Sequence, residues 1–133
     1  MKERLIVILS LISFLTFSQD LITDEDFEDK INLRSAFDDS GESIVIVEFW
    51  ASFNKDNQFN DYDKLEGVKF YRCDISKSPK AKKSHKVKTI PHLVIFKNGI
   101  DEIHFKAGIG FALKATLGEI QVAIKELKVA SKF

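Results

Sequence analysis

The sequence is poor in sulfur, with a single cysteine, Cys73, among 133 residues. One cysteine cannot close a disulfide within its own chain, and it cannot supply the two thiols that dithiol–disulfide exchange requires. The hydrophobic core must therefore hold the fold without a covalent bridge. The 3 histidines show no metal-ligand spacing, so we expect no metal site.

The chain also lacks an excess of either charge, with 20 Lys+Arg against 20 Asp+Glu. Proteins that bind nucleic acid usually have a strong basic excess, so we expect no nucleic-acid partner. A hydrophobic content of 44% is typical of a folded globular protein, and the length suits one domain with a core of its own. Nothing in the sequence points to a cofactor.

No apolar run is long enough to span a bilayer, which takes about 20 residues. The N-terminus nevertheless has the form of a secretory signal peptide, because two basic residues precede an apolar run over residues 5–17. Thr16 and Ser18 suit the −3 and −1 positions of a cleavage site. We therefore expect residues 1–18 to be a signal peptide and residues 19–133 to be a secreted or periplasmic domain with no stable membrane insertion after cleavage. An uncleaved anchor is the alternative.

The apolar pattern predicts strands and helices that alternate along the chain. Residues 43–50 are almost continuously apolar, as is typical of a strand buried on both faces. Asn98–Gly99 between two apolar runs predicts a hairpin. The pattern predicts an α/β fold with a mixed central sheet flanked by helices. Strands are expected at 20–23, 43–50, 68–75, 92–96 and 100–105, and helices at 24–37, from about 54, at 78–86 and from 116.

Two motifs resemble the thioredoxin family: VEFWA at 47–51 and TIPHLVIFKNG at 89–99. In that family a central strand reading V-D-F-W-A delivers a C-G-P-C corner to a helix N-terminus, and a cis-proline preceded by Ile packs against it. Trp50 matches the first motif, Glu48 stands where the family has a buried acid, and Ile90–Pro91 matches the cis-proline pair. The resemblance follows the element order of most of the chain and implies a thioredoxin fold.

The family's two cysteines are absent, because Asn54-Lys55-Asp56-Asn57 occupies their corner. An amide is neither a nucleophile nor a leaving group in thiol exchange, so we expect no catalytic residue here. Asn54 is expected to cap the following helix by accepting from the backbone N–H of Asn57, with contact to a ligand as the alternative. A shortened second helix and a longer segment at 107–115 are further departures from the family pattern.

Glu48 and Cys73 are the remaining candidates for chemistry. A carboxyl in a strand buried on both faces should have a raised pKa, so we expect Glu48→Leu to stabilise the domain at neutral pH. Cys73 lies inside an expected strand and is interpreted as a small core residue.

The resemblance implies a groove beside the cis-proline where an extended peptide pairs with the backbone. The leading hypothesis is a secreted, redox-inactive, thioredoxin-like module that binds protein or extended peptide there. The alternative is a thiol–disulfide redox protein that acts through Cys73 or with a cysteine-bearing partner. The expected peptide-binding residues are Trp50, Phe53, Asn54, Thr89, Ile90 and Pro91.

Charge is segregated along the chain although the total is balanced. Residues 77–88 hold six lysines and no acid, while residues 24–29 are mostly acidic. A lysine run usually forms a solvated helix face, but the asymmetry would also suit an acidic partner surface.

Overall fold

The structure is a computed structural model that describes residues 21–32 and 43–130. The expected signal peptide and the end of the first helix lie outside these ranges. None of the described helices is both long enough and apolar enough to cross a membrane. The elements are β1 (Leu21–Ile22), α2 (Phe27–Ile31), β2 (Ile44–Trp50), the 3-10 helices η2 (Ser52–Asn57) and η3 (Asp61–Lys64), β3 (Lys69–Asp74), α3 (Pro79–Ser84), β4 (His92–Lys97), β5 (Ile100–Lys106) and α4 (Leu117–Ala130).

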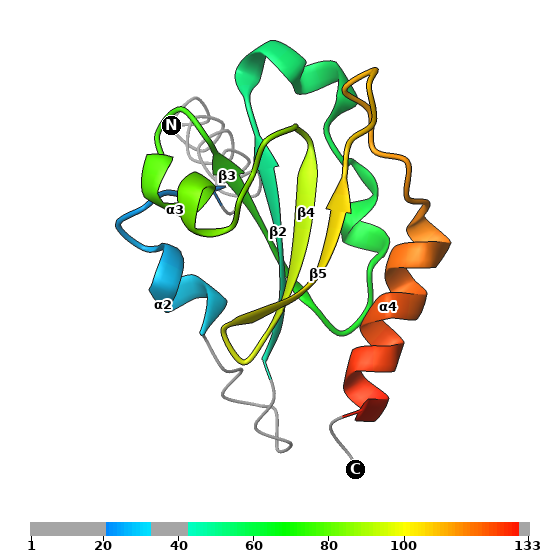
Figure 1. Ribbon diagram of the computed structural model, residues 1–133. Helices are drawn as coiled ribbons and strands as arrows, with labels where there is room; N and C mark the ends of the chain where they lie inside the picture. The colour runs from blue at the N-terminus through cyan, green and yellow to red at the C-terminus, as the bar shows by residue number, and fades with distance from the viewer. Residues whose placement is uncertain (1–20, 33–42, 131–133) are drawn as a thin grey trace, which may run out of the picture.

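The described strands form a 5-stranded mixed sheet in the order β1-β3-β2-β4-β5 (Figure 1). β1, β3 and β2 run parallel, whereas β4 pairs antiparallel with β2 and β5 antiparallel with β4. The hairpin turns at Asn98 (φ 52°) and Gly99 (φ 83°), whose positive φ angles suit a two-residue turn. The expected α/β class with a mixed sheet flanked by helices is confirmed.

Two cores lie on opposite faces of the sheet, because side chains alternate along β2. Val45, Val47 and Phe49 pack on the face that α2 and α3 cover, and Ile44 and Ile46 pack on the face that α4 covers (Figure 1). An apolar stripe of the last helix packs into this second core: Leu117, Ile120, Ile124 and Leu127.

The α-helix expected from about residue 54 is wrong, since η2 and η3 take its place. Asn and Asp are frequent between residues 54 and 63, and their side chains compete with the helical backbone for hydrogen bonds. The segment still contributes to the core, because Phe59 and Leu65 are buried and the partly buried Tyr62 packs against the same cluster.

The start of α3 is capped from a distant part of the chain. Ser78 and Pro79 occupy the N-cap and first helical positions, but the Ser78 side chain makes no capping bond. Instead Asp24 accepts the backbone N–H groups of Lys80 (3.0 Å) and Ala81 (2.8 Å). The acidic segment is thus bound to the N-terminus of the lysine-rich helix. The helix dipole favours a carboxylate at that end.

Candidate functional site

The two motifs of the sequence meet at one corner of the sheet. The register pairs Phe49 of β2 with His92 of β4, so the end of β2 lies beside the loop that enters β4. The Ile90–Pro91 peptide bond in that loop is cis. We call residues 50–57 and 89–91 the corner.

Asn54 joins three parts of the chain at the corner, and the residue is only 9% exposed. Its Nδ2 donates to the carbonyl oxygens of Ile90 (3.1 Å) and Phe111 (3.0 Å), and its Oδ1 accepts from Nδ2 of Asn57 (2.8 Å). The prediction that Asn54 caps a helix is wrong, because η2 has no side-chain capping bond. The amide instead clamps the loop before β4 to the segment 107–115. Contact between Asn54 and a ligand stays a prediction.

Three apolar side chains around this clamp point into solvent. Phe53 is 79% exposed, Ile109 is 101% exposed and Phe111 is 52% exposed. We call these three residues the apolar rim. The turn that presents Ile109 is closed by the Phe111 N–H, which donates to the Gly108 carbonyl (3.1 Å). The unusual length of segment 107–115 was the only sequence signal for this feature.

The other expected contact residues surround the loop before β4. Ile90 and Pro91 are buried, while Thr89 and Trp50 are half-buried. Trp50 Nε1 has no hydrogen-bond partner within the described residues. Thr89 lies on a hollow of about 350 Å³ lined by Lys86, Lys88, Thr89, Lys106 and Ala107. Among residues 89–91, Thr89 is therefore the most accessible to a ligand.

Glu48 shares the face of β2 with Ile44 and Ile46, which α4 covers. It is fully buried, at 0% exposure. Its Oε1 accepts from Arg72 Nε (2.8 Å), and its Oε2 accepts from the Phe59 N–H (2.7 Å). Burial raises the pKa of Glu48, as expected, although the Phe59 N–H and Arg72 oppose that shift. Sequence reasoning missed Arg72, which stands directly opposite Glu48 in the parallel register. The available sequence signal was an arginine between the apolar residues Tyr71 and Cys73 of this strand.

Cys73 lies inside β3 and is completely buried. Burial raises the pKa of the Cys73 thiol to about 11. At neutral pH only about one such thiol in ten thousand is ionised, and the thiolate is the reactive form. Cys73 is therefore a core residue rather than an activated nucleophile.

The three histidines of the chain meet on the α3 side of β4 and β5, beside Asp101. Their sequence spacing did not predict this, because the cluster joins the end of α3 to two strands. No group of three or more His, Cys, Asp or Glu side chains within the described residues has an arrangement that could hold a metal ion.

Comparisons with known proteins identify the fold. No family model and no curated protein matches this chain. A designed protein of known structure matches with a TM-score of 0.61 and 20% identity, over 83% of this chain and 97% of that one. A chain from a structure on thiol resolution in yeast mitochondrial 1-Cys peroxiredoxin, via glutathione/thioredoxin systems, matches with a TM-score of 0.57 and 18% identity, over 82% of this chain and 95% of that one. The chain has a thioredoxin-like fold.

Proposed function

We propose that this chain is a secreted or periplasmic, redox-inactive module that binds an extended segment of a protein partner at the corner. The apolar rim supports this proposal best. Phe53, Ile109 and Phe111 gather exposed apolar surface around the loop at residues 89–91. Gathered apolar surface beside accessible polar groups is typical of an interaction site.

An extended peptide would bind by laying its backbone along the loop at Thr89 and its apolar side chains on the rim. The Ile90 carbonyl already accepts from Asn54 but has a second lone pair for a peptide N–H. The clamp by Asn54 also holds the rim beside the loop before any peptide arrives. Such preorganisation lowers the entropy lost on binding.

Two features support the proposed redox inactivity: the residue types at the corner and the burial of the one thiol. Asn54 and Asn57 cannot exchange with a disulfide, and Cys73 is buried with a raised pKa. The alternative, redox chemistry through Cys73, would require the core to open before the thiol could react.

Peptide titration followed by backbone amide NMR tests the binding proposal. The probe is an unstructured peptide of about ten residues in which leucine and glutamine alternate. We expect shifts at Phe53, Thr89 and Phe111, and about tenfold weaker binding by Phe53→Ser, or about 1.4 kcal/mol. Val122→Ser removes a 54% exposed side chain from α4 and serves as the matched control, with unchanged binding expected. Equal affinity of both variants and the parent would place binding away from the corner.

Two further assays test the remaining parts of the proposal. Reduction of insulin disulfides should stay at the background rate, whereas a reductase activity that Cys73→Ala abolishes would support the redox alternative. N-terminal sequencing of the exported protein should begin at Gln19 if residues 1–18 are removed. A protein that keeps its N-terminus in the membrane fraction would be anchored instead.

A further inference from the structure

A bulge in β5 brings two polar side chains to the same face of the sheet. In a regular strand, residues three apart point to opposite faces. Here Ile95 pairs with Ile103 and Phe96 pairs with Asp101, which leaves Glu102 as an extra residue. Asp101 and His104 consequently point together toward the C-terminal end of α3.

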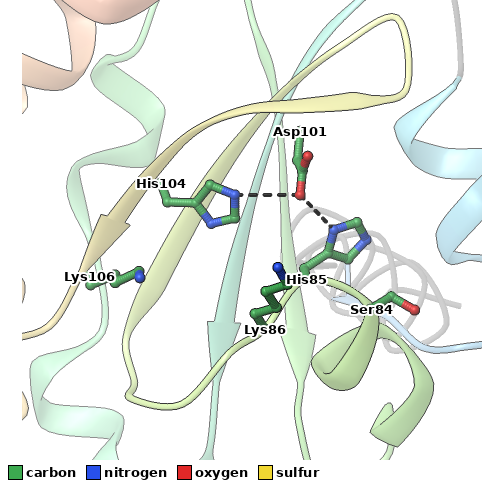
Figure 2. A pocket seen from close by; sticks show the side chains of 6 residues that line it. All are labelled: Ser84, His85, Lys86, Asp101, His104 and Lys106. Carbon is green, nitrogen blue, oxygen red and sulfur yellow. Dashed lines mark hydrogen bonds and ion pairs between the residues drawn. The ribbon is translucent and has the colours of Figure 1, made fainter.

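Three side chains converge at this bulge (Figure 2). Asp101 Oδ2 lies 3.2 Å from Nδ1 of His85 and 3.4 Å from Nε2 of His104. The His104 Nδ1 lies 2.9 Å from Nε2 of the buried His92. Because a carboxylate only accepts, the histidine nitrogens that face it carry hydrogen, and His104 Nδ1 accepts from His92. The network holds the rings in fixed orientations.

The same three side chains line a cavity of about 370 Å³ that is rich in positive charge. Its lining is Ser84, His85, Lys86, Asp101, His104 and Lys106 (Figure 2). Two ammonium groups face one carboxylate, so the cavity has a surplus positive charge even when both histidines are neutral. Neither lysine forms an ion pair within residues 21–32 and 43–130. An anionic group is the ligand that this arrangement suits.

The cavity continues toward the corner. Lys86 and Lys106 also line the hollow at Thr89, where Lys88 adds a third ammonium group. Lys106 pairs with His92, the residue directly after the cis-proline, so the end of β5 lies beside the peptide-binding loop. A chain laid along Thr89 would pass these lysines on its way to the cavity.

We propose that the peptide bound at the corner is acidic, and that one of its Asp or Glu carboxylates enters the cavity between Lys86 and Lys106. This inference rests on the proposed function. It assigns the ligand's charge and the residues that select it, which are Lys86 of the lysine run and Lys106 at the end of β5. The carboxylate accepts hydrogen bonds from the ammonium groups, beside rings that Asp101 keeps in place.

A pair of peptides tests the selection at low salt, about 20 mM, where screening is weak. The leucine–glutamine peptide is compared with its leucine–glutamate counterpart, which has the same length and shape. We expect the glutamate peptide to bind the parent about tenfold more tightly. In Lys86→Met/Lys106→Met the preference should fall below about twofold, because methionine keeps the apolar stem and loses the charge. Lys77→Met/Lys80→Met is the matched control, since neither lysine lines the cavity or the hollow.

Each outcome decides something. Equal binding of both peptides, with Phe53→Ser weakening both, would overturn the acidic preference and leave the proposed function standing. If both double variants lose the preference equally, the peptide is attracted to the lysines in general. That result would contradict binding of its carboxylate in the cavity. If neither peptide binds the parent, both proposals are overturned. Circular dichroism of each variant confirms that it is folded.

Discussion

Glu48 and Asp101 are two carboxylates on strands of one sheet, and their surroundings give them opposite roles. Glu48 is 0% exposed and forms an ion pair with Arg72, whose Nε lies 2.8 Å from Glu48 Oε1. The Asp101 side chain is 38% exposed and lies between two histidines that line a cavity. A buried carboxylate paired with a cation stabilises the fold, whereas a partly exposed carboxylate beside a cavity contributes less to stability.

The position of Glu48 explains why a buried ion pair is present there. Glu48 accepts the Phe59 N–H, and Arg72 donates to the Phe59 carbonyl at 2.8 Å. Both polar groups of one backbone position between η2 and η3 are thus satisfied from the sheet. A regular helix would have satisfied them internally.

The largest effect in the comparison of Glu48 with Asp101 is expected when the buried ion pair of Glu48 and Arg72 is removed. Arg72→Leu should lower the free energy of unfolding by about 3–5 kcal/mol, because Glu48 is left buried without its cation. Glu48→Leu should destabilise for the same reason, which reverses the effect expected from the sequence. Urea unfolding measures both variants.

The double variant Glu48→Leu/Arg72→Leu is the control for that experiment. Removing both charges leaves no buried ion, so it should recover much of the lost stability. Strict additivity of the two single changes would mean that the pair does not interact.

The second prediction concerns pH and the inner end of the histidine network. Burial lowers the pKa of His92 to about 4, and the nearby charges of His104, Lys106 and His85 act in the same direction. The unfolded chain binds this proton more readily, so the contribution of His92 is complete above about pH 6.5 and is lost as pH falls toward 4. The loss has an upper bound of about 3 kcal/mol.

His92→Phe isolates that contribution. Stability measured in urea at about pH 7.5 and pH 4.5 should differ less in His92→Phe than in the parent. Glu48 titrates in the opposite sense, because its raised pKa favours the folded state at low pH. It is present in both proteins, so it cancels in the difference. An unchanged pH dependence would contradict a neutral, buried His92.

A third prediction tests the clamp at the corner. Asn54→Ala removes the hydrogen bonds to Ile90 and Phe111 and should lower stability by about 1–2 kcal/mol. Amide hydrogen exchange should quicken in segment 107–115. Asn57→Ala loses only its bond to Asn54 and is the control, with little change in that segment. Equal protection in both variants would show that packing alone holds the loop.

The smallest effect is expected at Asp101. Asp101→Asn removes the charge from a partly exposed network, so the free energy of unfolding should change by less than about 1 kcal/mol. A loss as large as that of Arg72→Leu would abolish the distinction between the two carboxylates. Urea unfolding at neutral pH makes the comparison directly.

Much of the fold could be predicted because it rests on local patterns. Three patterns each act within a few positions along the chain: the almost continuously apolar residues 44–50, the turn residues Asn98–Gly99 and the apolar stripe of α4. The sequence of strands and helices then left few ways to arrange a mixed sheet. The helix expected from residue 54 failed because its Asn and Asp side chains favour irregular backbone.

Sequence alone determined the order of the elements, the burial of Glu48 and the absence of a thiol pair. Only the tertiary structure decided how polar groups are satisfied, because their partners come from far along the chain. Arg72 lies 24 positions from Glu48, Ile90 lies 36 positions from Asn54, and the Ala81 N–H finds Asp24 across 57 positions. The histidine cluster further depends on a bulge, which apolar periodicity does not record. Periodicity reports which face a side chain takes, whereas a hydrogen bond depends on which distant residue reaches that face.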